Sequence, residues 1–135
     1  MRRLVLAIAA CAFGGTSALA QGAPHLDEAL KKAPYRASWN EFLDKAKPAP
    51  DWLRHFSRTA DGVTTPARSL KLSDGDYELY TLCKPHDCAA NKLHVIFAKG
   101  GAKVGGALID KGRGPRLIGD QSAEMTAALI RSFAQ

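Results

Sequence analysis

Residues 81–98, TLCKPHDCAANKLHVIFA, combine a small cysteine-bounded loop with the strand pattern that follows it. Four residues, Lys-Pro-His-Asp, separate Cys83 from Cys88. Residues 92–98 are rich in branched and aromatic side chains, which favours a β-strand, and residues 77–83 have the same character on the other side of the loop. The stretch therefore predicts a hairpin whose two strands are joined through the cysteine-bounded loop.

The segments on either side of this hairpin predict further strands. Residues 68–72 alternate polar and apolar side chains, as a half-buried strand does, and the turn sequence SDGD joins them to residue 77. Residues 104–109 follow the second hairpin strand after a glycine-containing turn, and residues 116–118 form a short edge strand. Residues 62–66 contain glycine and proline and are predicted to be a loop.

Helices are predicted before and after these strands. Residues 26–33 form a short amphipathic helix, and the capping-box pattern from Ser38 to Glu41 opens a second helix that ends at about Lys45. Two further helical segments are a turn capped by Asp51 and carrying Trp52, Leu53 and Phe56, and a helix over 120–133 with Met125, Leu129, Ile130 and Phe133 on one face.

The N-terminus has the three parts of a secretory signal peptide. Arg2 and Arg3 precede a short apolar stretch, and Ala18-Leu19-Ala20 is a small-x-small cleavage site. We therefore expect residues 1–20 to be a signal peptide and residues 21–135 to form one domain. An alternative lipoprotein box would leave Cys11 acylated, and both interpretations imply export. No other stretch has the length of a membrane span.

Charge argues against one class of partner. The chain carries 19 basic and 13 acidic side chains, and two of the basic ones lie in the predicted signal peptide. The remainder has a net charge of +4, without a basic run that alternates with aromatic residues. This pattern suits an exported protein's surface and argues against nucleic-acid binding.

Two cysteines remain after the signal peptide. In an oxidising compartment Cys83 and Cys88 are expected to form a disulfide. A ring of about six residues contributes roughly 2 kcal/mol by chain entropy, so the bond fixes the shape of the loop more than it stabilises the domain. With strands grouped between helices and no β-α-β alternation, the sequence predicts an α+β fold: a central antiparallel β-sheet flanked by N-terminal and C-terminal helices, with a disulfide-stapled protruding loop.

The loop leaves several functional alternatives open. His86 can simply face solvent in a stapled hairpin. A zinc site would use Cys83, His86 and Cys88 with His55 or His94, but its spacing differs from that of zinc fingers and an oxidising compartment favours the disulfide. A thioredoxin-like role requires a C-x-x-C motif, which is absent, and nucleophilic catalysis requires a base beside a free nucleophile. No catalytic residue, metal or cofactor is therefore predicted.

The hexapeptide Cys83-Lys84-Pro85-His86-Asp87-Cys88 resembles the signature loop of the inhibitor of vertebrate lysozyme (Ivy) family, periplasmic proteins of Gram-negative bacteria. Pro50-Asp51-Trp52, Thr65-Pro66, Tyr77 and the apolar strand 93–97 also match the family's pattern, and the resemblance is best over residues 48–110. It implies a periplasmic protein that is not an enzyme, binds c-type lysozyme, protects against a host defence and forms a homodimer.

The resemblance also implies a mechanism. Lysozyme uses a general-acid Glu and a nucleophilic Asp whose carboxyl groups lie roughly 5 Å apart. A neutral imidazole has one donor and one acceptor nitrogen, so His86 between these carboxyls donates to one and accepts from the other. Lys84 and Asp87 are expected to contact the target, Pro85 to restrict the loop, and Cys83 and Cys88 to serve as scaffold.

The positive net charge of the chain fits a vertebrate lysozyme as target poorly. Vertebrate lysozymes are basic, and like net charges slow association. An acidic patch made of Asp74, Asp76, Glu78 and Asp87 would offset this repulsion. Alternatively, the target is a bacterial lytic transglycosylase, or the protein is an envelope-binding module that inhibits nothing.

Overall fold

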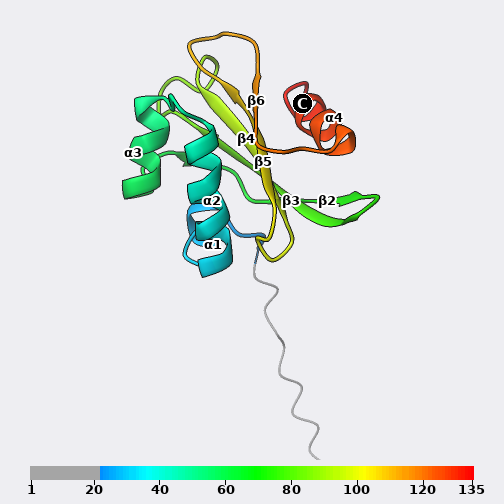
Figure 1. Cartoon of the computed structure of the whole chain (residues 1–135). Coiled ribbons are helices and arrows are strands. Elements are labelled where there is room, and N and C mark those ends of the chain that lie inside the picture. The colour runs from blue at the N-terminus through cyan, green and yellow to red at the C-terminus, as the bar shows by residue number, and fades with distance from the viewer. Residues whose placement is uncertain (1–21) are drawn as a thin grey trace, which may run out of the picture.

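A six-stranded antiparallel sheet separates three N-terminal helices from one C-terminal helix (Figure 1). The structure, a computed structural model, describes residues 22–135. The predicted signal peptide and Cys11 therefore lie outside the described residues. The strand order is β1-β3-β4-β5-β6, and β2 pairs with the other part of β3. This architecture confirms the predicted α+β fold with a central antiparallel sheet and flanking helices.

The strands follow the sequence prediction closely, with one addition. Their bounds are β1 Val63–Thr64, β2 Arg68–Leu72, β3 Gly75–Cys83, β4 Lys92–Ala98, β5 Val104–Ile109 and β6 Arg116–Ile118. β3 begins two residues before the predicted start. The segment 62–66, predicted to be a loop, contains β1. Its β-branched residues Val63 and Thr64 pair with Cys83 and Leu82 at the C-terminal end of β3.

The helices differ more from their predicted bounds. They are α1 Leu26–Ala29, α2 Ala33–Lys45, α3 Asp51–Thr59 and α4 Ala123–Ser132. The predicted start of α2 at Ser38 is wrong: the helix begins five residues earlier, and Pro34 occupies its first turn. The Ser38 hydroxyl donates to the Gly101 carbonyl at 2.5 Å, which ties α2 to the β4–β5 turn.

Two other helices begin at residues that differ from the prediction. Asp51 was predicted as a cap but is the first residue of α3, and its carboxylate accepts from Arg54. α4 begins after Ser122, whose hydroxyl accepts the Met125 backbone N–H at 3.1 Å. None of the helices within residues 22–135 is long and apolar enough to cross a membrane.

The sheet is covered on both faces. Leu93, Val95 and Phe97 of β4 pack in the cluster under α1–α3, to which α2 contributes Trp39 and Phe42. The alternate positions of β4 face α4, so this strand is buried along most of its length. Ile130 was predicted on the buried face of α4, but it is 46% exposed.

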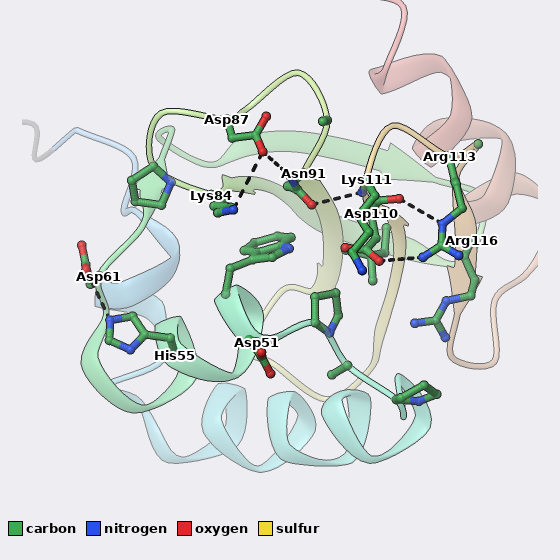
Figure 2. Close-up of a pocket in the computed structure, with 18 residues that line it drawn as sticks. Asp51, His55, Asp61, Lys84, Asp87, Asn91, Asp110, Lys111, Arg113 and Arg116 are labelled. Carbon is green, nitrogen blue, oxygen red and sulfur yellow. Dashed lines mark hydrogen bonds and ion pairs between the residues drawn. The ribbon is translucent and has the colours of Figure 1, made fainter.

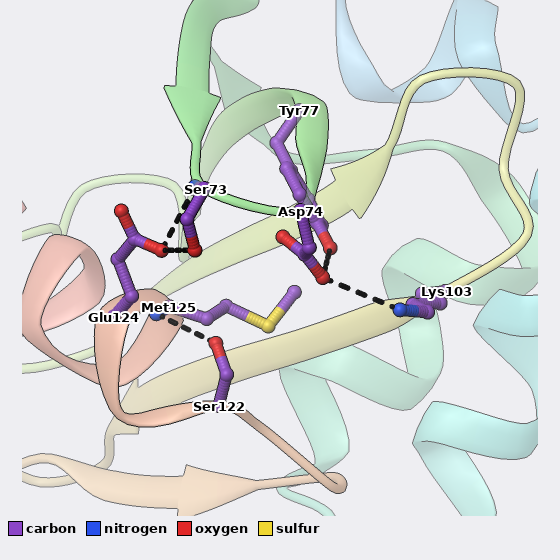
Figure 3. Close-up of polar contacts among 7 residues, drawn as sticks. All are labelled: Ser73, Asp74, Tyr77, Lys103, Ser122, Glu124 and Met125. Atoms are coloured by element: carbon purple, nitrogen blue, oxygen red, sulfur yellow. Dashed lines mark hydrogen bonds and ion pairs between the residues drawn. The ribbon is translucent and has the colours of Figure 1, made fainter.

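The β2–β3 turn is held at the far end of β3 from Cys83 (Figure 3). Ser73 donates from its backbone N–H and its hydroxyl to one Glu124 carboxylate oxygen, at 2.9 and 2.6 Å. Asp74 accepts from the Tyr77 hydroxyl at 2.8 Å, and this bond lowers the pKa of the carboxyl. The Ser73–Glu124 bonds anchor the hairpin to α4, and the cysteine-bounded turn lies at the opposite end of β3.

Candidate functional site

The connection between β3 and β4 contains the disulfide that the sequence predicted. Cys83 and Cys88 are bonded, and their Cα atoms lie 4.9 Å apart. Cys83 is the last residue of β3 and pairs with Lys92, the first residue of β4. The disulfide therefore closes its loop directly on the rigid end of the hairpin.

Inside the disulfide, four residues form a tight turn with His86 exposed. The Asp87 N–H donates to the Lys84 carbonyl at 3.1 Å, and His86 has a φ of 63°. Pro85 at the second position and a positive φ at the third are the combination found in type II turns. Histidine adopts this left-handed backbone conformation more readily than most residues, and in this turn it is exposed to solvent.

A residue for which the sequence carried no signal holds this turn. Asn91, 5% exposed, donates from its side-chain amide to the Asp87 carboxylate at 2.7 Å. Its side-chain oxygen accepts the Lys111 backbone N–H at 3.1 Å. The turn and the β5–β6 connection are thereby joined through one buried side chain (Figure 2). The local pattern does not indicate this role, because Lys111 is twenty residues away.

A groove of about 1400 Å³ lies beside the turn (Figure 2). Pro50, Asp51 and Trp52 line one side, and Lys84, Pro85 and Asp87 line another. The rest of the wall comes largely from the β5–β6 connection, with Asp110, Lys111, Arg113, Gly114 and Arg116. His86 does not line the groove. The turn is thus flanked by a concave surface that has a tryptophan in its wall and charges of both signs around it.

The zinc hypothesis is not supported by the geometry. Cys83 and Cys88 are joined to each other, and His94 is buried against Ser132 and Phe133 on the α4 face. His55 lies beside Asp61, with a 3.3 Å separation between imidazole and carboxylate. No group of three potential metal ligands occurs within residues 22–135.

The acidic patch expected from the sequence does not form. Asp74 and Asp76 lie at the start of β3, and Asp87 follows its end, so a strand of roughly 25 Å separates them. The Glu78 carboxylate accepts from the hydroxyls of Tyr35 and Tyr80, at 2.6 and 3.2 Å, and does not contribute to a surface around the turn.

Residues 34–134 match a family model described as inhibitor of vertebrate lysozyme (Ivy). The chain belongs to the Ivy family. The matched region includes all six strands, the disulfide and Asn91. Because Ivy is a family of inhibitors, membership agrees with the prediction that the chain is not an enzyme.

Relatives of this Ivy chain occur in several bacteria. A Pseudomonas aeruginosa protein named inhibitor of vertebrate lysozyme is 35% identical over 96 residues, which cover 71% of this chain and 60% of that protein. An Escherichia coli protein of the same name is 30% identical over 84 residues, 62% of this chain and 50% of its own length. A Yersinia pestis protein is 27% identical over 99 residues, 73% and 62% respectively. The matches thus span 50–62% of these relatives' lengths.

Two of the segments that carry the Ivy resemblance lie near the site, whereas Tyr77 lies at the other end of β3. Pro50, Asp51 and Trp52 line the groove, and Thr65 donates its backbone N–H to Thr81 of β3 at 3.2 Å. The β5–β6 connection was not predicted to belong to this end of the molecule. Its proximity to the turn depends on strand pairing and on the bond between Gly112 N–H and the Ala90 carbonyl, 2.8 Å long.

Proposed function

We propose that this Ivy chain inhibits a c-type lysozyme by inserting the turn Lys84–Pro85–His86–Asp87 into the active-site cleft. The observation that carries the proposal is the exposed His86, held at a positive φ in a turn that a disulfide closes. Membership in a family named for lysozyme inhibition supports the choice of target class.

The chemistry follows from the two kinds of nitrogen in a neutral imidazole. The general-acid Glu of lysozyme has a pKa of about 6 and is protonated near that pH, whereas the Asp nucleophile stays ionised. His86 donates its N–H to the Asp and accepts the Glu proton at its bare nitrogen. One side chain then engages both catalytic groups and blocks entry of the glycan.

Pre-organisation explains the residues around the histidine. A flexible loop loses conformational freedom on binding, which weakens affinity. The disulfide, the fixed φ of Pro85 and the Asp87–Asn91 bond remove that freedom before the target arrives. Lys84 and Asp87 form a long ion pair of 3.9 Å and both side chains are partly exposed, so a target can reach them at the surface of the turn.

The location and assembly belong to the same proposal. Residues 1–20 would direct export, and residues 21–135 would act as one domain in the periplasm, where peptidoglycan-cleaving enzymes are met. A homodimer would present two such turns. Lipid anchoring through Cys11 is the alternative form of export.

A lytic transglycosylase is the second candidate target, favoured by the charges of the groove. Lys111 and Arg116 line it and form no ion pair with any carboxylate of residues 22–135. The groove also has four acidic side chains in its lining, but at the wall formed by these two unpaired cations it suits an acidic part of a target's cleft rim and repels a basic one. A module that binds the envelope without inhibiting is the third hypothesis, and it predicts tolerance of changes at His86.

Competition for the cleft tests the insertion. The affinity of residues 21–135 for a c-type lysozyme is measured by calorimetry, with and without a saturating N-acetylglucosamine oligomer in the cleft. Insertion predicts that apparent affinity falls as oligomer occupancy rises. Affinity that is unchanged when the cleft is full would contradict the proposal, because the turn would then bind elsewhere.

A further inference from the structure

The side chain of Asn91 connects two loops that come from different parts of the chain (Figure 2). Its amide nitrogen is 2.7 Å from the Asp87 carboxylate, and its oxygen is 3.1 Å from the Lys111 backbone nitrogen. Only 5% of the residue is exposed, so water does not replace these partners readily. Both ends of the amide are therefore satisfied by protein groups.

The partners leave one orientation for the amide. The Asp87 carboxylate, when ionised, only accepts hydrogen bonds, and a backbone N–H only donates. Turning the amide over would place oxygen against oxygen and nitrogen against nitrogen. Asn91 therefore matches an acceptor on the turn and a donor on the β5–β6 connection at the same time, which neither an aspartate nor an aliphatic residue does.

The backbone around Asn91 supports the same junction. Its N–H donates to the Asp87 carbonyl and its carbonyl accepts from Lys84, each at 3.1 Å. Ala90 accepts the Gly112 N–H at 2.8 Å. These backbone bonds do not involve the Asn91 side chain, so we expect a substitution there to test the side-chain link without removing the turn.

We infer that Asn91 is a positioning residue for the His86 turn, locking it to the β5–β6 connection so that the two loops act as one rigid recognition surface. The inference rests on the proposed function, since it assigns Asn91 a role in placing the histidine in the target. Asn91 is buried and acts through Asp87, the residue next to His86.

The most informative variants change which member of the Asn91–Asp87 pair donates the hydrogen bond and which accepts it. Asn91→Asp keeps the acceptor for Lys111 but places two carboxylates together, whereas Asn91→Ala removes both bonds. The exchange Asn91→Asp with Asp87→Asn restores a donor–acceptor pair at unchanged net charge. Ser132→Ala is the matched control, because Ser132 is also 5% exposed and hydrogen-bonded, but it lies in α4 on the opposite face of the sheet.

Amide hydrogen exchange tests the positioning without any target. We expect the Lys111 and Asp87 amides to exchange about tenfold faster in Asn91→Ala than in the parent. In Asn91→Asp, which keeps the acceptor for Lys111, the faster exchange should be confined to Asp87. Amides of β4 should keep the parent's protection, and the double variant Asn91→Asp with Asp87→Asn should restore the protection of the amide at position 87. Equal exchange at Lys111 and Asp87 in the parent and Asn91→Ala would overturn the inference.

Inhibition of a c-type lysozyme by the same variants tests the consequence. Asn91→Ala should inhibit about tenfold less well than the parent, whereas Ser132→Ala should lower thermal stability alone. In a His86→Ala background Asn91→Ala should add little further loss, and full additivity would overturn the inference. If the parent does not inhibit, the proposed function fails, while the exchange experiment still decides whether Asn91 positions the turn.

Discussion

His94 and Ser132 join the central strand β4 to the C-terminal helix α4 through a buried hydrogen bond. The Ser132 hydroxyl donates its only hydrogen to the Leu129 carbonyl at 2.6 Å. The His94 Nδ1 must therefore carry the hydrogen in this bond. The imidazole also stacks on Phe133, with ring centroids 3.9 Å apart. A neutral histidine thus fixes α4 on the sheet face opposite the helices α1–α3.

Acid should destabilise the fold through His94 before the carboxyl groups titrate. Burial lowers its pKa to about 4, with help from the positive charges of Lys92 and Arg68. The unfolded histidine binds a proton near pH 6.5, so the unfolded state holds more protons between that pH and 4. Unfolding free energy should therefore fall by at most about 2–3 kcal/mol as the pH drops across this window.

Urea unfolding at several pH values between 7 and 4 measures this loss. His94→Gln provides the comparison, since glutamine does not titrate. Parallel pH dependence of the parent and His94→Gln would show that His94 is not the source.

The disulfide should matter more for inhibition than for folding. Its ring is short, so replacing Cys83 and Cys88 by serine should cost about 2 kcal/mol of unfolding free energy. An energy of about 2 kcal/mol corresponds to about 30-fold in affinity. Because a mobile turn must be ordered on binding, we expect the affinity for the target to fall by more than that. Thermal unfolding and inhibition are measured on the same preparation. Equal losses in the two measurements would argue against a pre-organised turn.

Gly106 should be intolerant of any side chain. A Cβ there would lie 2.8 Å from the Phe42 ring and 3.0 Å from the His94 carbonyl. Gly106→Ala should therefore overpack the interface between α2 and β5 and cost about 1–3 kcal/mol of unfolding free energy. Denaturant titration gives the value, with Gly114→Ala as the control because a methyl group there would meet no atom within 4 Å. Wild-type stability in Gly106→Ala would contradict this close packing of α2 on β5.

The charges of the β5–β6 connection should discriminate between targets. Lys111→Glu combined with Arg116→Glu removes two positive charges from the groove wall and adds two negative ones. Association with a basic lysozyme should become faster at low salt, and association with an enzyme that has an acidic rim should become slower. Stopped-flow association rates at two ionic strengths provide the test. Unchanged rates for both enzymes would mean that this connection does not face the target.

Five of the six strands were predictable because each has a local signal, whereas β1 was missed in a segment that contains glycine and proline. A glycine-containing turn joins β4 to β5, both strands carry branched side chains, and both have the predicted bounds. The start of α2 was missed because Ser38 and Glu41 imitate a capping box inside a longer helix. Ser38 instead bonds to Gly101, 63 residues away, and no local pattern carries that information.

The site was predictable in part for the same reason. The two cysteines that remain after the predicted signal peptide indicated the disulfide, and the hexapeptide indicated the family. The role of Asn91 was not visible, because it depends on Lys111, which strand pairing brings beside the turn. The acidic patch does not form, because the extended strand β3 lies between residues 74 and 87 and places them at opposite ends of the strand.

Lysis of peptidoglycan-bearing cells by a c-type lysozyme, titrated with residues 21–135 and with the His86→Ala variant, tests the central claim most directly. Lys71→Ala, an exposed truncation on the distant strand β2, is the control. The account predicts inhibition by the parent and by Lys71→Ala, and at least a roughly hundredfold weaker inhibition by His86→Ala, since one charge-assisted and one neutral hydrogen bond are lost. Equal inhibition by the parent and His86→Ala would contradict it.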